Sequence, residues 1–151
     1  MSASSHLRGF PDLPPVWALG LYLAQQACAA WVPLVRYEAG PAGIVMAAAG
    51  LALILWSAVW FWRKRTPIEP HHTPRALIVE GPYRLNRNPI YTGLALVLVG
   101  TGLNAGALSS LLLSALFPPL ITRRFVLKEE AALRAAFGAA ADTYIANSRR
   151  W

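Results

Sequence analysis

Four long apolar runs divide the chain, with polar segments between and after them. The runs cover about residues 14–34, 42–62, 90–106 and 107–125. Each contains roughly 17 to 22 residues, and a helix needs about 20 to cross a hydrocarbon core of ~30 Å. In lipid a helix satisfies its own backbone hydrogen bonds, so each run predicts a membrane-spanning helix. We therefore expect an all-α integral membrane protein with four transmembrane helices.

Composition agrees with that pattern. Hydrophobic residues make up 56% of the 151 residues and charged residues 14%. A soluble domain usually carries about 25% charged residues, so the composition disfavours a soluble enzyme and excludes a disordered chain. The length fits one domain, residues 1–151. The single cysteine, Cys28, excludes an intrachain disulfide. The adjacent His71 and His72 lack further ligands nearby, so we expect no metal site.

Lysine and arginine gather in two segments, 63–87 and 123–150, which hold all but two of the 14 cations. Cytoplasmic loops of membrane proteins carry such an excess. Four spans place both segments on one side, so we expect both segments and both chain termini in the cytoplasm. Topology then explains the net charge of +7, and we expect no nucleic acid partner. The basic, alanine-rich composition is typical of a bacterial protein and points to the bacterial inner membrane.

The polar segment before the third run is rich in proline and ends at Pro89. Proline fixes φ, so the segment is extended and restrained, and Pro89 suits the first turn of a helix. Free backbone N–H groups at that helix start, with Arg87 beside them, form a candidate site for a carboxylate. The alternative is that Arg87 is one more cytoplasmic cation beside a loop.

The fourth run continues into a polar helix. Residues 107–137 would span about 45 Å at 1.5 Å per residue, which exceeds the bilayer. Glu129 and Glu130 are therefore expected near the interface. An ion pair between Glu130 and Arg134, four residues apart, is the simple interpretation. Gly138 predicts the end of this helix.

Polar and special residues inside the spans predict how the helices pack. Gln25 and Gln26 lie in the first run, where they either bond between helices or line a substrate route. Glycines in the second and third runs allow helix backbones to approach closely. Pro118 and Pro119 lack a backbone N–H, so they predict a bend or break in the fourth span.

Two motifs, in this order, resemble a known family. The first is Gly81-Pro82-Tyr83 with Arg87-Asn88-Pro89-Ile90-Tyr91-Thr92-Gly93, and the second is Glu129-Glu130 with Phe137-Gly138, Tyr144 and Arg150-Trp151. With them, residues 66–151 are similar to the integral membrane methyltransferases that include isoprenylcysteine carboxyl methyltransferase and phosphatidylethanolamine N-methyltransferase. The isoprenylcysteine enzymes carry histidine where this chain has Asn88, and the phospholipid enzymes carry asparagine. The family often has a tyrosine where this chain has Ala141, so any contact of that ring is lost.

The resemblance implies a cytoplasmic pocket for S-adenosylmethionine, formed by the motif regions 66–93 and 129–151, with S-adenosylhomocysteine as the product. It implies that Arg87 and Glu130 are catalytic. The implied cofactor-binding residues are Tyr83, Arg87, Asn88, Pro89, Tyr91, Glu129 and Glu130. Charge matching supports these roles, because the glutamates suit the ammonium group, Arg87 suits the carboxylate, and tyrosine rings suit the sulfonium.

The methyl acceptor is expected to be lipophilic and to arrive from the membrane, because four spans with short outer turns leave little aqueous surface. An isoprenylcysteine carboxylate, a phospholipid amine and a thiol all stay open as acceptors, as does the oligomeric state. A lateral route is predicted between the third and fourth spans, lined by small residues such as Gly100. An amine or thiol must lose a proton, for which a glutamate at the membrane edge is available. The competing hypothesis is a non-catalytic membrane scaffold or a lipid-binding relative of the family.

Overall fold

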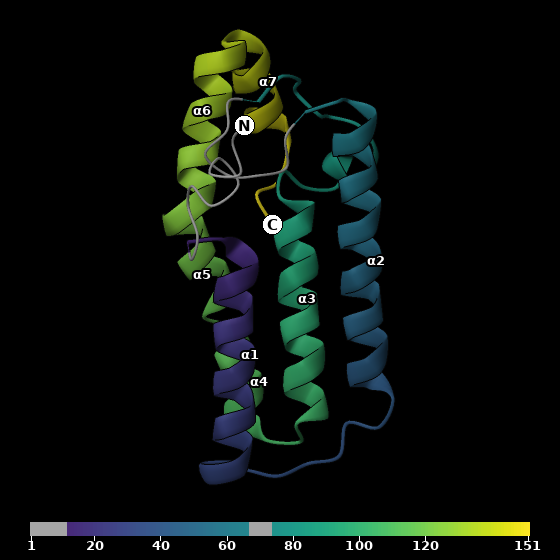
Figure 1. The fold of residues 1–151 in the computed structure, drawn as a ribbon, viewed down its shortest axis with the longest axis vertical. Helices are drawn as coiled ribbons and strands as arrows, with labels where there is room; N and C mark the ends of the chain where they lie inside the picture. The colour runs from purple at the N-terminus through teal and green to yellow at the C-terminus, as the bar shows by residue number, and fades with distance from the viewer. Residues whose placement is uncertain (1–11, 67–73) are drawn as a thin grey trace, which may run out of the picture.

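The computed structural model describes residues 12–66 and 74–151 and is a bundle of helices drawn out along one axis (Figure 1). The helices are α1 (Pro14–Trp31), α2 (Ala42–Arg63), α3 (Pro89–Asn104), α4 (Leu108–Ser114), α5 (Phe117–Ile121), α6 (Leu127–Phe137) and α7 (Ala139–Asn147). A 3-10 turn, η1 (Gly81–Arg84), precedes α3, and a π-helical turn, η2 (Thr122–Val126), joins α5 to α6. The described residues form no strand beyond one isolated β-bridge, which confirms the all-α prediction.

The helices begin close to the predicted positions, and two of them end earlier. α1 stops at Trp31 rather than at residue 34, because Pro33 follows and the residue before a proline avoids the helical conformation. α3 stops at Asn104 rather than at residue 106, and Gly106 takes a φ of 64° to start the return turn. The two connections at this end are tied together, since the Tyr37 N–H donates to the Gly106 carbonyl at 3.0 Å.

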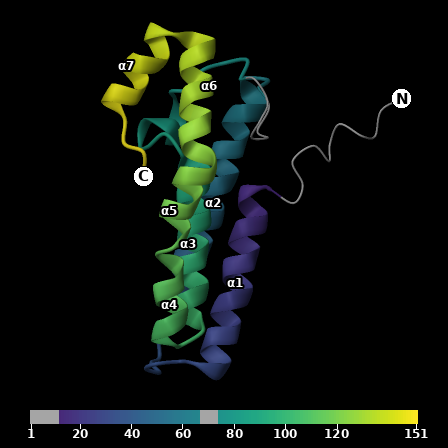
Figure 2. The ribbon, with the colours of Figure 1, turned by 90° about the vertical axis from the view of Figure 1, so that its left-hand side faces the viewer.

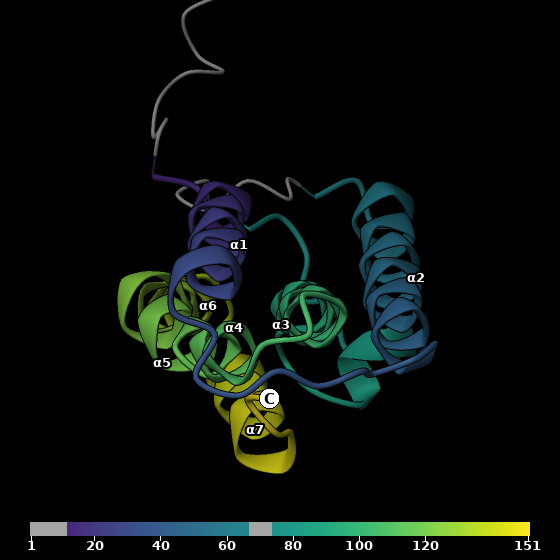
Figure 3. The ribbon, with the colours of Figure 1, turned by 90° about the horizontal axis from the view of Figure 1, so that it is seen from below.

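Helix α3 lies between α2 on one side and α1 with α4 on the other, as the view from below shows (Figure 3). α2 and α3 meet backbone to backbone through small residues. A Cβ atom on Gly100 would lie 2.5 Å from the Ala47 nitrogen and 2.6 Å from the Gly43 oxygen, and one on Gly93 would lie 2.7 Å from the Gly50 oxygen. Such approach is how membrane helices gain packing energy. The expectation that Gly100 lines a route between the third and fourth spans is wrong, because Gly100 faces α2.

A polar cluster joins α1 to α3 and α4 inside the bundle. The Gln25 side chain is fully buried, and its Nε2 donates to the Leu98 carbonyl at 2.9 Å and to the Ser114 hydroxyl at 2.8 Å. Its Oε1 accepts from the Thr101 hydroxyl at 2.8 Å. The interpretation that Gln25 bonds between helices is confirmed, whereas Gln26 is exposed.

The fourth run is helical with two irregularities, and its pieces follow one another along the long axis (Figure 2). The helix stops at Ser114 and resumes at Phe117. Pro118 and Pro119 then stand in the first turn of α5, where a missing N–H removes no helical hydrogen bond. The predicted break is therefore confirmed. The single helix expected over residues 107–125 is replaced by α4, α5 and η2, and helical structure continues through α6 to Phe137, as predicted.

Two helices of the described chain are long and apolar enough to cross a membrane by length and composition. They are α2 and the stretch Leu108–Phe137, which contains α4, α5, η2 and α6, while α3 is apolar but shorter. The elements alternate in direction, so the start of α1, the end of α2 and the C-terminal tail, which is the chain after Gly138, all lie toward the same end of the molecule (Figure 1). This arrangement agrees with the expected parity of the chain. Crossing by all four elements stays a prediction.

Candidate functional site

A cavity of about 640 Å³ lies where α2 ends and α3 begins. Its volume is in the range of small-molecule pockets, and most of its lining is apolar. The polar residues of its wall are Thr66, Tyr83, Arg87, Asn88, Tyr91, Lys128, Glu129, Glu130 and Tyr144. Six of the seven predicted cofactor-binding residues thus surround one cavity. The seventh, Pro89, is buried as the first residue of α3 and is not part of the lining.

Turn η1 carries Tyr83 into the cavity wall. Gly81 makes this possible, because its φ is +59° and a Cβ atom there would run into the indole of Trp60. The Phe61 ring meets the Tyr83 ring edge to face, with centroids 5.8 Å apart. From the tail, the Tyr144 hydroxyl donates to the Tyr83 carbonyl at 2.9 Å. Burial raises the pKa of Tyr83 above its ordinary value and raises the pKa of Tyr144 to about 12, so both hydroxyls stay protonated at neutral pH.

Tyr91, in the first turn of α3, connects the two motifs. Its hydroxyl donates to Oε1 of Glu129 at 2.5 Å, and both side chains line the cavity. Among the described residues, no hydrogen bond reaches the other carboxylate oxygen of Glu129. Glu129 therefore presents to the cavity a carboxylate of which Tyr91 holds one oxygen, while the other oxygen accepts no hydrogen bond from the part of the chain that the structure describes.

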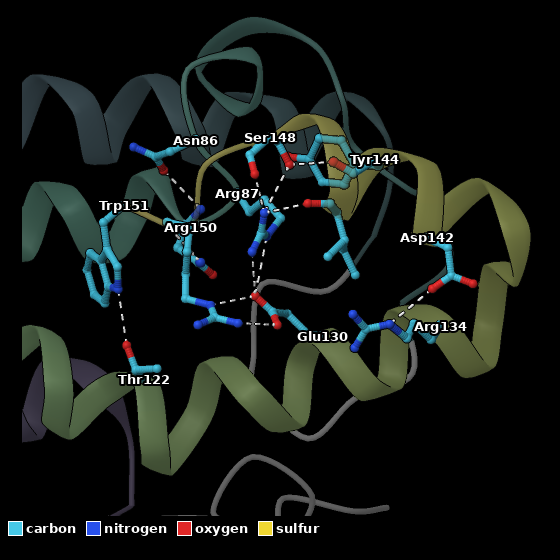
Figure 4. Close-up of polar contacts among 12 residues, drawn as sticks. Asn86, Arg87, Thr122, Glu130, Arg134, Asp142, Tyr144, Ser148, Arg150 and Trp151 are labelled. Atoms are coloured by element: carbon cyan, nitrogen blue, oxygen red, sulfur yellow. Dashed lines mark hydrogen bonds and ion pairs between the residues drawn. The ribbon is translucent and has the colours of Figure 1, made fainter.

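Glu130 is held between two arginines (Figure 4). Arg87 donates through Nη2 to Oε1 of Glu130 at 3.0 Å. Arg150 donates through Nε to Oε1 and through Nη2 to Oε2, both at 2.8 Å. The Glu130 side chain is 6% exposed and that of Arg87 is 9% exposed, so each charge depends on its partners. The hydrogen bond to Glu130 also raises the pKa of Arg150 above its ordinary value.

The other donors of Arg87 bind the tail. Its Nη1 donates to the Ile145 carbonyl at 2.8 Å and to the Ser148 carbonyl. Asn88 next to it donates through Nδ2 to the Arg150 carbonyl at 2.9 Å. Because both residues also line the cavity, they form a wall between the cavity and the tail.

Gly138 turns the chain between α6 and α7 with a φ of +51°, and α6 ends before it, as predicted. The turn brings α7 back beside α6, and Arg134 there binds Asp142 at 3.1 Å. The simple interpretation of an ion pair between Glu130 and Arg134 is therefore wrong, because Glu130 binds Arg87 and Arg150 while Arg134 binds Asp142. Ala141, at the position where the family often has tyrosine, is fully buried.

The structure brings Arg87 and Glu130 into contact, as expected for two motifs at one end of the molecule. The contact of Arg150 with Glu130 was not predicted from the sequence. The available signal was the Arg-Trp pair at the end of the second motif, but spacing alone does not reveal the partner of a side chain after a turn. His71 and His72 lie outside the described residues. Within residues 12–66 and 74–151, no three side chains among His, Cys, Asp and Glu gather as metal ligands.

A model of the family described as phospholipid methyltransferase matches residues 41–140, which are 100 of the 151 residues. The match begins just before α2 and ends just after Gly138, so it contains the first motif and the glutamate pair but not Arg150. No curated protein and no solved structure gives a significant match.

Proposed function

The chain belongs to the phospholipid methyltransferase family, and from this membership we propose that it transfers a methyl group from S-adenosylmethionine to a phospholipid amine. Membership points to a membrane methyltransferase with a lipid-type acceptor. The cofactor, the amine, the cytoplasmic side of the reaction and the roles of single residues are the parts that we propose. The observation that carries the proposal is the cavity that gathers Tyr83, Tyr91 and Glu129 at the end of the bundle.

The residues of the cavity fit the cofactor's chemistry. S-adenosylmethionine, when bound, supplies a methyl group activated by a sulfonium. Tyr83 and Tyr91 offer aromatic rings, whose faces attract such a cation. Glu129 offers a carboxylate for the cofactor's ammonium group or for the acceptor amine. The apolar remainder of the wall keeps water away from the reacting groups.

Glu129 is better placed than Glu130 to take the proton that the acceptor amine must lose. Both oxygens of Glu130 already accept hydrogen bonds from the guanidinium groups of Arg87 and Arg150. Glu129 keeps one oxygen free of hydrogen bonds among the described residues, and Tyr91 fixes the orientation of the other. We assign Glu129 as the general base, with Tyr91 positioning it. Glu130 and Arg87 then have a structural role, in which their ion pair and the bonds of Arg87 to the tail hold the cavity wall in place.

An amine suits the site better than a carboxylate acceptor. Arg87 is bonded to Glu130 and to tail carbonyls, so it is not free to bind an acceptor carboxylate.

For the entry of the acceptor we favour the side between α1 and α2, instead of the predicted route beside α4. The cavity lining runs from Leu13, Pro14 and Pro15 at the start of α1 to Phe61 at the end of α2, and these two helices stand apart beside α3 (Figure 3).

The test is methyl transfer in reconstituted vesicles with labelled S-adenosylmethionine. Vesicles carrying an aminophospholipid are compared with vesicles carrying a prenylated cysteine or a lipophilic thiol. We expect label in the aminophospholipid alone. Label in the prenylcysteine ester or the thioether would overturn the amine assignment while keeping the methyltransferase.

Cofactor binding separates the enzyme from the non-catalytic alternative. Calorimetry of purified protein with S-adenosylhomocysteine should show binding at a single site, and Glu129→Gln should weaken it. A protein that neither binds the product nor labels any of the three acceptors would be a scaffold or lipid-binding member of the family, and the proposal would fall.

A further inference from the structure

The last four residues, Ser148–Trp151, form what we call the C-terminal strap. The strap follows α7 and has no helical structure. It returns along the start of α3 toward η2, so that Arg150 points at Glu130 and Trp151 at Thr122 (Figure 4). The Trp151 ring packs against the bundle core, and its Nε1 donates to the Thr122 hydroxyl at 3.1 Å.

The strap is bound by both motifs. The Arg87 backbone N–H donates to the Arg149 carbonyl at 2.7 Å, and the Asn88 side chain donates to the Arg150 carbonyl at 2.9 Å. Arg150 in turn makes two hydrogen bonds of 2.8 Å to Glu130. Among the described residues, Arg150 is the strap side chain that forms an ion pair with a charged residue of the cavity wall, while the Ser148 hydroxyl accepts a longer hydrogen bond of 3.5 Å from Arg87.

Removing the Arg150 guanidinium would leave Glu130 with Arg87 as its remaining charged partner. Glu130 is almost fully buried, and a buried carboxylate depends strongly on the number of charged donors that it accepts. Glu130 and Arg87 would then shift relative to each other, and both line the cavity. The Arg150 side chain itself is 37% exposed and is not part of the cavity lining, so it acts on the cavity through Glu130.

We propose that Arg150 is a positioning residue for the proposed methyl transfer, and that the docked strap sets the cofactor affinity of the cavity. The proposal rests on the proposed function, since it concerns the same site. Affinity and docking are linked reciprocally: if the docked strap favours the cofactor, the cofactor favours the docked strap. The strap is thus a second determinant of the site, supplied by the part of the chain beyond the family match.

The experiment compares Arg150→Met with Arg149→Met and Arg150→Lys. Arg149 is exposed and makes no ion pair among the described residues, so its variant is the matched control. Arg150→Met should raise the cofactor KM and the dissociation constant of S-adenosylhomocysteine about tenfold or more, with kcat changed less than about threefold. Arg150→Lys should fall between wild type and Arg150→Met, because lysine keeps the charge and loses the two-pronged geometry.

A second measurement uses the unmodified protein and does not depend on how the variants fold. Hydrogen exchange of residues 145–151 is followed with and without S-adenosylhomocysteine, and we expect the product to slow it. Unchanged exchange on saturation, or an Arg150→Met that binds like Arg149→Met, would overturn the role of the strap alone. A wild-type protein that binds no cofactor would overturn the proposed function and, with it, this proposal.

Discussion

Substituting Gly100 by alanine tests the close packing between α2 and α3, which both contribute residues to the cavity lining. The added Cβ atom would lie 2.5 Å from the Ala47 nitrogen, whereas ordinary contacts are at least 3.4 Å. The backbones of α2 and α3 must therefore separate by about 0.9 Å, the difference of those two values. Overpacking of this kind costs ~1–3 kcal/mol. In a membrane no hydrophobic gain between helices offsets that cost.

Gly20 supplies the matched control for this change. It lies on the exposed side of α1, and a Cβ atom there would meet nothing within 4 Å. Thermal unfolding in detergent should show Gly20→Ala at or slightly above wild type, because alanine favours a helix more than glycine does. Gly100→Ala should melt several degrees lower. A Gly100→Ala protein as stable as Gly20→Ala would refute the close backbone contact between α2 and α3.

Three further substitutions probe the site itself. Glu129→Gln should lower kcat by ~100-fold or more at saturating cofactor, since a general base contributes that much, and a near-normal kcat would exclude the base role. Gly81→Ala should cost ~1–3 kcal/mol in thermal unfolding, because φ is +59° and the Trp60 indole fills the space, so an unchanged midpoint would contradict the turn geometry. Tyr144→Phe should cost ~1 kcal/mol by removing a hydrogen bond. Because folding raises the pKa of Tyr144 from 10.0 to about 12, wild type should also lose stability as pH rises from 10 through 12, and the phenylalanine variant should lack that component of the loss.

Sequence alone reached the helical architecture and the meeting of the two motifs. Apolar run lengths report how much chain fits a bilayer, so the start of α2 and the extension of the last helix to Gly138 were readable. The charge distribution placed Arg87 and Glu130 at the same end, and they touch at 3.0 Å. Both inferences depend on properties summed over many residues, which survive errors at any one position.

Details that depend on rotation about a helix axis were not readable. Gly100 turned out to face α2, because the direction of a glycine on a wholly apolar helix leaves no polar pattern from which to infer it. The same limit applies to Glu130, whose neighbour at the favourable spacing, Arg134, points instead to Asp142 across the Gly138 turn. Partners supplied by a chain reversal, such as Arg150, are invisible to local spacing rules.

The π-helical turn η2 sets how far α6 is rotated about its axis relative to α5. Each residue of a regular α-helix advances by about 100°, so positions nine apart face nearly opposite directions. Ile121 and Glu130 are nine apart, yet both are buried. A π turn contains one additional residue, so it sets back the rotation of the following helix by roughly the 100° that one residue contributes. The π turn therefore lets α5 direct Ile121 into the bundle core and α6 direct Glu130 toward the cavity, although regular helical spacing would place them on opposite faces. Deleting one residue between Thr122 and Val126 would turn the carboxylates away while leaving the core helix in register.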